Sequence, residues 1–99
     1  TDEQKRTIKT KLAASLSTEK EVRRIVIFGS FVKAASPHDL DVAVFQDSSE
    51  TYLPLAMKYR RLTRELSNSI PLDIVPLKFS EKSGLFLEEV NKGETIYEK

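Results

Sequence analysis

Residues 25–45 read IVIFGSFVKAASPHDLDVAVF and contain the features on which the expected fold depends. The run Ile25–Phe28 is apolar and rich in β-branched residues, which is typical of a strand buried on both faces. Gly29 and Ser30 follow it directly, and a Gly-Ser pair indicates a turn. A second run, Asp39–Phe45, alternates polar and apolar residues at its start, as strands do. The stretch therefore predicts a strand, a turn, a loop and a second strand.

Two aspartates lie on one face of the second expected strand. Side chains alternate between the two faces of a strand, so Asp39 and Asp41 share one face while Leu40 and Val42 share the other. Two carboxylates about 7 Å apart along one strand repel each other, and removing them from water is costly. A divalent cation or solvent between them relieves both effects. The pair therefore predicts a cation site at the edge of the core.

The composition is that of one small domain. A chain of 99 residues with 39% hydrophobic residues can form one core, so we expect a single domain over residues 1–99. The net charge of +1 gives no general attraction for nucleic acid or a membrane surface. The absence of cysteine excludes thiolate metal sites, and the single His38 excludes a multi-histidine zinc site. Without an apolar run of transmembrane length or a signal-peptide pattern, a cytoplasmic protein is expected.

Hydrophobic periodicity places the expected helices. They span residues 2–17, 50–68 and a last segment that begins near residue 80, with a single turn over residues 31–35. Ser48 or Ser49 is the expected N-cap of the long helix, and Tyr52 and Tyr59 are interpreted as its core residues. Gly93 is expected to end the last helix as a C-cap glycine.

A third strand is expected over Pro71–Leu77, after a first strand over Val22–Phe28. Pro71 and Pro76 lack the N–H that strand pairing needs, which indicates an edge strand or a strand with limited pairing. Asp73 interrupts the apolar pattern of this strand, and residues 94–97 add a short last strand. The order of elements predicts an α/β or α+β domain, in which helices pack on a small sheet.

Three aspartates lie on strands that should be neighbours: Asp39, Asp41 and Asp73. Aspartate is a hard oxygen ligand, and Mg²⁺ typically binds one or two protein carboxylates plus substrate phosphates. Two such ions about 3.5–4 Å apart can hold both the attacking and the leaving oxygen of an in-line displacement. The carboxylates therefore favour phosphoryl or nucleotidyl transfer.

The Gly-Ser turn can give a phosphate space close to the backbone and hydrogen-bond donors. Gly29 lets the backbone approach a phosphate closely, and Ser30 can donate its hydroxyl and its backbone N–H. Lys33, one helical turn later, can add positive charge. The turn is therefore a candidate triphosphate-binding site.

These motifs resemble the DNA polymerase β-like nucleotidyltransferase superfamily, and the small size matches its minimal nucleotidyltransferase (MNT) branch. The resemblance is carried by Ile27–Ser30, Asp39–Val44 and Leu72–Val75, and the order of elements matches over nearly the whole chain. It implies a nucleotidyltransferase fold with a small mixed sheet. It also implies metal-dependent transfer of a nucleoside monophosphate onto a hydroxyl: AMP is expected, from ATP, and another NTP with its own nucleoside monophosphate is the alternative.

The resemblance also assigns roles to residues and implies a partner. Gly29 and Ser30 would hold the triphosphate, and Asp39 and Asp41 would bind two Mg²⁺ ions. Asp73 would complete the second metal site and assist deprotonation. Free-standing minimal members often act as the antitoxin of a helical HEPN protein, so a HEPN-type partner is expected. Some add AMP to a tyrosine of that partner.

Other interpretations remain open at the level of sequence. Family members typically read Gly-Ser-x-Ala-Arg-Gly, whereas this chain has Lys33 and Ala34 in the last two positions, so it could neutralise its partner by contact alone. The near-neutral charge argues against an RNA acceptor, a small-molecule acceptor is also less favoured, and a homodimer is left open. Asp73 could instead form a structural salt bridge. The cations of the long helix are interpreted as a solvated face, with an acidic partner or RNA as the alternative: Lys58, Arg60, Arg61 and Arg64.

Overall fold

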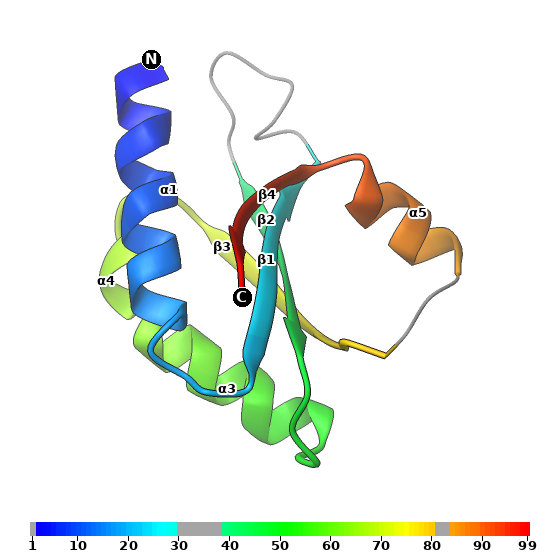
Figure 1. Ribbon diagram of the computed structural model, residues 1–99. Coiled ribbons are helices and arrows are strands. Elements are labelled where there is room, and N and C mark those ends of the chain that lie inside the picture. The colour runs from blue at the N-terminus through cyan, green and yellow to red at the C-terminus, as the bar shows by residue number, and fades with distance from the viewer. Residues whose placement is uncertain (1, 30–38, 81–83) are drawn as a thin grey trace.

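A four-stranded sheet with strand order β3-β2-β1-β4 forms the centre of the molecule (Figure 1). The computed structural model describes residues 2–29, 39–80 and 84–99 of the chain. The strands are β1 (Val22–Phe28), β2 (Leu40–Gln46), β3 (Leu72–Lys78) and β4 (Glu94–Glu98). The helices are α1 (Asp2–Leu16), α3 (Tyr52–Leu62), α4 (Arg64–Ser67) and α5 (Leu85–Asn91). Apart from the expected turn over residues 31–35, which lies outside the described residues, the predicted helix and strand order is confirmed, and the first strand matches at both ends.

The sheet is mixed, as the resemblance implied. β1 pairs antiparallel with β2 and with β4, whereas β2 and β3 run parallel. Phe28 at the end of β1 lies opposite Asp41 near the start of β2. Leu40 and Asp41 in turn lie beside Leu72 and Asp73 at the start of β3. One end of the sheet therefore brings together the end of β1 and the beginnings of β2 and β3.

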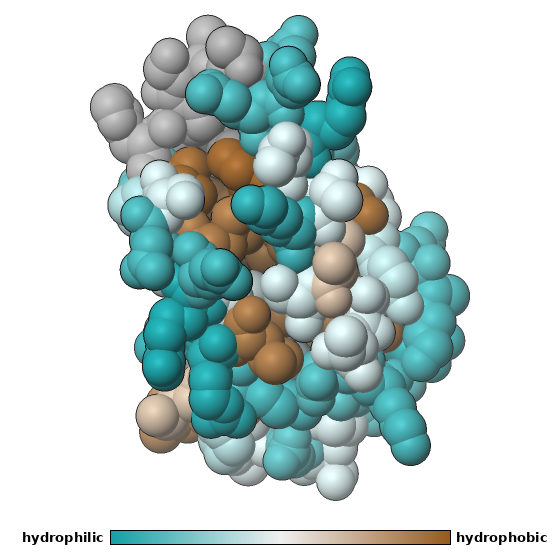
Figure 2. Space-filling model, turned by 90° about the vertical axis from the view of Figure 1, so that its left-hand side faces the viewer, coloured by the Kyte–Doolittle hydropathy of each residue, from teal (hydrophilic) through white to brown (hydrophobic). Residues whose placement is uncertain are grey.

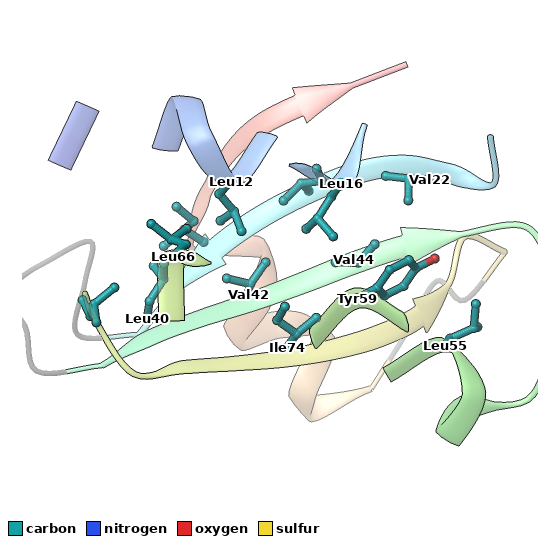
Figure 3. Close-up of a cluster of buried hydrophobic side chains, with 13 residues drawn as sticks. Leu12, Leu16, Val22, Leu40, Val42, Val44, Leu55, Tyr59, Leu66 and Ile74 are labelled. Atoms are coloured by element: carbon teal, nitrogen blue, oxygen red, sulfur yellow. The ribbon is translucent and has the colours of Figure 1, made fainter. Parts of the chain in front are cut away.

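Helices cover both faces of the sheet. Figure 1 shows α1, α3 and α4 on one side and the short α5 on the other. The larger core cluster fills the first side, where side chains from α1, α3 and α4 meet those of three strands (Figure 3); it includes Leu12, Leu16, Ile25, Ile27, Val42, Val44, Tyr59 and Ile74. A smaller cluster lies under α5 and comprises Val26, Ala43, Phe45, Leu87 and Val90. Along the described part of the chain, no helix combines the length and apolarity needed to cross a bilayer.

Pro76 lies in β3 and Pro71 directly precedes it, and β3 is an edge strand, as expected. The N–H of Leu40 donates to the carbonyl of Pro71 (2.9 Å), and that of Phe79 donates to the carbonyl of Gln46 (2.8 Å). Because backbone groups alternate in direction along a strand, the odd-numbered residues of β3 face β2 and Pro76 faces the free edge. The missing N–H of Pro76 therefore removes no ladder hydrogen bond and discourages pairing with another chain.

The prediction of one continuous helix over residues 50–68 is wrong. This segment is divided at Thr63 into α3 and α4. The buried hydroxyl of Thr63 donates to the carbonyl of Tyr59 (2.8 Å), and the backbone of Thr63 leaves helical geometry at φ −107° and ψ 13°. A threonine hydroxyl that bonds back to the preceding turn bends helices. Periodicity does not reveal this break, because Leu66 resumes the same buried face.

Two details at the start of α3 also differ from expectation. Thr51 occupies the N-cap position without a side-chain cap bond. Ser48 instead accepts a hydrogen bond from the N–H of Glu50 (3.2 Å), which forms a local turn before the helix. Tyr59 is fully buried, whereas Tyr52 is 54% exposed, so the core interpretation of Tyr52 was wrong.

A charged cluster joins α3 to the entry of β1. The ammonium of Lys58 lies 2.8 Å from Glu21 and 3.1 Å from Glu19, and the hydroxyl of Tyr59 donates to Glu21 (2.8 Å). Burial by itself raises the pKa of Glu21, but the hydrogen bonds from Lys58 and Tyr59 outweigh it, and the pKa lies below its ordinary value. The cluster therefore stabilises the fold through an ionised Glu21.

We expect Glu21→Gln to destabilise the protein at neutral pH by about 1–2 kcal/mol, because it replaces charge-assisted hydrogen bonds. A carboxyl whose pKa is lower in the folded state stabilises the fold fully at pH values above its pKa in the unfolded state, 4.5. This stabilisation is lost as the pH falls through the pKa of the folded state. Urea unfolding at pH 7 and at about pH 3 should therefore show that the difference in unfolding free energy between wild type and Glu21→Gln becomes smaller in acid. Glu65→Gln, an exposed position on α4, is the control. A difference in unfolding free energy that stays the same at both pH values would contradict this role.

Candidate functional site

Asp41 and Asp73 are brought side by side by the parallel pairing of β2 and β3. They are register partners in neighbouring strands, so their side chains project from the same face of the sheet. That face is the one on which α5 packs, because Ala43, two residues after Asp41, belongs to the cluster under α5. The two carboxylates therefore lie on the α5 side, at the end of the sheet where β2 and β3 begin.

Gly29 closes the site from the end of β1. It has a φ of +77°, a conformation that side chains other than glycine rarely adopt. A Cβ placed on Gly29 would lie 2.6 Å from the Oδ2 atom of Asp41. The turn that was predicted to receive a phosphate is thus in contact distance of the carboxylate that was predicted to bind metal, and only a glycine leaves room for both.

The electrostatics of Asp41 favour a bound cation. Burial raises the pKa of the Asp41 carboxyl above its ordinary value, and the negative charges of Asp73 and Asp39 raise it further. A cation between these groups would remove the repulsion that raises the pKa. Among the described residues, no three carboxylate or histidine side chains form a complete metal-binding group. The arrangement fits Mg²⁺, which takes one or two protein carboxylates and completes its shell with water and substrate phosphates.

The other predicted site residues have different surroundings. Asp39 directly precedes β2 and is exposed, and its charge acts on Asp41. Asp73 is exposed and forms no ion pair within the described residues, so the structural salt bridge considered for it is not found there. Ser30, Lys33 and the expected helical turn over residues 31–35 lie outside the described residues.

Gly93 supports the site, although the sequence suggested a different role for it. The C-cap of α5 is Lys92, and positive φ angles among the described glycines occur at Gly29 and Gly84. Gly93 instead packs against β1, where an added Cβ would overlap the carbonyl oxygen of Ile27 and lie 2.9 Å from the Cβ of Phe28. The expected place of Gly93 just after the end of α5 is confirmed, but it is not a left-handed cap conformation that requires a glycine there. Its lack of a side chain lets β4 begin against the end of β1, beside the candidate site.

Gly29→Ala should weaken nucleotide binding more than it weakens the fold. The positive φ costs an alanine about 1–2 kcal/mol, and the new methyl displaces the Asp41 carboxylate, whose end can move. Gly84→Ala is the matched control, since Gly84 has a φ of +137° but no described residue has an atom within 4 Å of an added Cβ. Calorimetry with Mg²⁺ and ATP should show at least about a tenfold loss for Gly29→Ala, because a displaced metal ligand removes more than ~1.4 kcal/mol. Equal ATP affinity in the two variants would contradict the contact between Gly29 and the site.

Comparison with known families identifies a match over most of the chain. The family described as "Polymerase beta, Nucleotidyltransferase" matches residues 10–99. This range contains the Gly-Ser turn and the three aspartates. Among curated proteins, a sequence search finds no significant match.

Solved structures share the fold at low sequence identity. A chain of a toxin–antitoxin crystal structure with AMP-PNP superposes with a TM-score of 0.69 and 18% identity, covering 92% of this chain and 73% of that one. A chain of the MntA–HepT toxin–antitoxin gives a TM-score of 0.68 and 18% identity, with 95% and 73% covered. A chain of a third structure, of the tri-AMPylated Shewanella oneidensis HEPN toxin in complex with MNT antitoxin, gives a TM-score of 0.70 and 18% identity. This match covers 96% of this chain and 73% of that one. The predicted fold class is confirmed by this likeness together with the family match.

Proposed function

Since the chain belongs to the polymerase β nucleotidyltransferase family, we propose that it transfers a nucleoside monophosphate, AMP from ATP in the first instance, to a hydroxyl of a partner protein. The observation that carries this proposal is the register pairing of Asp41 with Asp73 beside Gly29. Two carboxylates and a close-approach glycine at one sheet end are what a metal-bound triphosphate requires. The assignment of Asp39, Asp41 and Asp73 as catalytic residues is part of the same proposal.

Each site residue has its own role in the proposed transfer. Asp41 and Asp73, with Asp39 beside them, would hold Mg²⁺, which when bound neutralises phosphate charge. Gly29 gives the triphosphate room next to Asp41, and we assign Ser30 and Lys33 to its phosphate oxygens. The acceptor oxygen bonds to the α-phosphorus, the bond from that phosphorus to the β-bridging oxygen breaks, and pyrophosphate leaves. A carboxylate oxygen of Asp73, which is exposed, accepts the hydroxyl proton.

The acceptor is proposed by analogy with the structural neighbours. Those neighbours come from structures of toxin–antitoxin complexes, and one contains a tri-AMPylated HEPN toxin with its MNT antitoxin. We therefore propose a HEPN-type protein as the partner and the chain as its antitoxin. A protein acceptor also suits the near-neutral net charge of +1, which gives nucleic acid no general attraction.

Isotope transfer tests the reaction. The protein is incubated with Mg²⁺, purified HEPN-domain proteins and ATP that carries its label on either the α- or the γ-phosphate. Label should enter the acceptor from α-labelled ATP and not from γ-labelled ATP, because the α-phosphoryl group is the one transferred. Absence of label from every HEPN protein that nonetheless binds the chain would count against transfer. That result would favour the alternative suggested by Lys33 and Ala34, in which the chain neutralises its partner by contact.

A further inference from the structure

The outer face of α3 and α4 carries a stripe of side chains that the proposed transfer does not use. At 3.6 residues per turn, the stripe residues project within an arc of about 100°. They are Leu53, Met57, Arg60, Arg61 and Arg64. Leu55 and Tyr59 project in the opposite direction into the core. Leu53 is 63% exposed and Met57 is 56% exposed, so the apolar half of the stripe is open to solvent.

The arginines of the stripe have no acidic partners among residues 2–29, 39–80 and 84–99. Within the described residues, Arg60, Arg61 and Arg64 form neither an ion pair nor a hydrogen bond through their side chains, whereas Lys9 and Arg23 pair with carboxylates at 2.9 Å. Residues 57–67 carry four cations and one carboxylate, a net charge of +3 in a chain of +1, which leaves −2 for the rest. Because Lys58 is paired with Glu19 and Glu21, the positive charge of this segment that has no partner among the described residues belongs to the three stripe arginines.

The stripe borders a hollow in the surface. Met57, the three arginines, Thr63 and Leu72 line a volume of about 390 Å³. The side of the molecule formed by α1, α3 and α4 shows apolar patches set among hydrophilic side chains (Figure 2). An apolar floor with cations around it can receive a side chain that is apolar and flanked by carboxylates.

We propose that the α3 stripe is the docking surface for an acidic amphipathic helix of the partner protein. From Leu53 to Arg61 the stripe runs along α3 for about 12 Å, just over two helical turns, and Arg64 continues it at the start of α4, which fits a helix laid against this face. The apolar residues of the incoming helix cover Leu53 and Met57, and its carboxylates meet the arginines. The stripe contains no aromatic side chain on which bases could stack, which disfavours single-stranded RNA.

The location of the stripe relates it to the proposed reaction. Leu72, at the edge of the hollow, is the first residue of β3 and directly precedes Asp73. A partner held at the α4 end of the stripe therefore lies near the start of β3, although Leu72 faces the hollow and Asp73 projects from the opposite face of the sheet. The identity of the partner as a HEPN-type protein rests on the proposed function, whereas the acidic, helical character of the docked segment rests on the stripe itself.

Fluorescence anisotropy tests the surface with defined probes. The main probe is a fluorescein-labelled helical peptide with leucines on one face and glutamates on the other. A scrambled peptide of the same composition and an oligouridine RNA of equal length serve as comparisons. The wild-type chain should bind the amphipathic peptide at least about fivefold more tightly than the scrambled one, and the affinity should fall as salt rises.

Variants locate the binding. The triple change Arg60→Glu, Arg61→Glu and Arg64→Glu should weaken peptide binding at least about tenfold, and Leu53→Ser with Met57→Ser should weaken it several-fold. A control of equal charge change, Lys11→Glu, Lys20→Glu and Lys92→Glu, uses exposed lysines elsewhere and should have a smaller effect. Circular dichroism confirms that each variant is folded. Asp41→Asn should bind the peptide like wild type, which separates this surface from the transfer site.

Three results would overturn the docking surface. They are equal losses in the two charge-reversed triples, equal binding of the amphipathic and scrambled peptides, and binding of RNA in preference to peptide. Failure of ATP binding with peptide binding intact would contradict the proposed function and leave the docking surface standing.

Discussion

Asp41→Asn is expected to lower the rate of nucleotidyl transfer at least about a hundredfold while leaving the protein folded and more stable. A bound metal ion contributes several kcal/mol to transition-state stabilisation, and ~1.4 kcal/mol corresponds to a tenfold change in rate. The increase in stability follows because burial and the charges of Asp73 and Asp39 disfavour the ionised Asp41 carboxyl, and asparagine carries no charge. Label transfer from α-labelled ATP and thermal unfolding without metal provide the two measurements.

A control on the same strand separates the metal site from general effects of charge. Asp47 follows β2 at its other end and pairs with Arg23 at 2.9 Å on the surface. Asp47→Asn should leave transfer unchanged and alter stability by less than about 1 kcal/mol. If Asp41→Asn retained transfer, or lost it only together with the fold, Asp41 would not act at the reacting phosphate.

Gly93→Ala should be more destabilising than Gly29→Ala or Gly84→Ala, and should lower the free energy of unfolding by about 2–4 kcal/mol. The added methyl overlaps the carbonyl oxygen of Ile27 and approaches Phe28, so the backbone at the end of β1 has to shift. For a domain of this size, the loss corresponds to a fall of about 10–20 °C in the unfolding midpoint. Thermal unfolding followed by circular dichroism measures it.

Lys92→Ala is the matched control for Gly93→Ala. Lys92 is the exposed neighbour at the C-cap of α5, so its truncation adds no atoms against the sheet and should change stability by less than about 0.5 kcal/mol. Because Gly93 abuts the residues before Gly29, the destabilised variant should also bind ATP less well. A Gly93→Ala protein as stable as Lys92→Ala would mean that β4 does not begin against β1 as described.

The strands that carry the site could be predicted because their local patterns are unambiguous. Ile25–Phe28 is a β-branched apolar run that ends at a Gly-Ser turn, and the structure ends β1 at Phe28. Pro76 indicated an edge strand, and β3 lies at the edge. Asp41 and Asp73 were expected on neighbouring strands, and their register confirms this. In each case the signal lies within a few residues of the feature that it predicts.

The features that were missed depend on contacts between distant parts of the chain. Gly93 is required by its approach to Ile27, 66 residues earlier in the sequence, and no local pattern contains that contact. Tyr52 shares the helical phase of Leu55, but it lies at the start of α3 and is 54% exposed. Thr63 interrupts the helix through a hydroxyl bond that periodicity does not encode. That the stripe arginines on α3 and α4 lack acidic partners in the described part of the chain likewise became visible only in three dimensions.

Isothermal calorimetry of ATP binding, with and without Mg²⁺, is the experiment that we would perform first, on wild type and on the double variant Asp41→Asn/Asp73→Asn. If the paired carboxylates beside Gly29 form a metal–nucleotide site, wild type binds ATP only when Mg²⁺ is present, and the double variant, still folded by circular dichroism, does not bind. Metal-independent binding, or Mg²⁺-dependent binding that survives in the double variant, would place the nucleotide elsewhere and contradict the site.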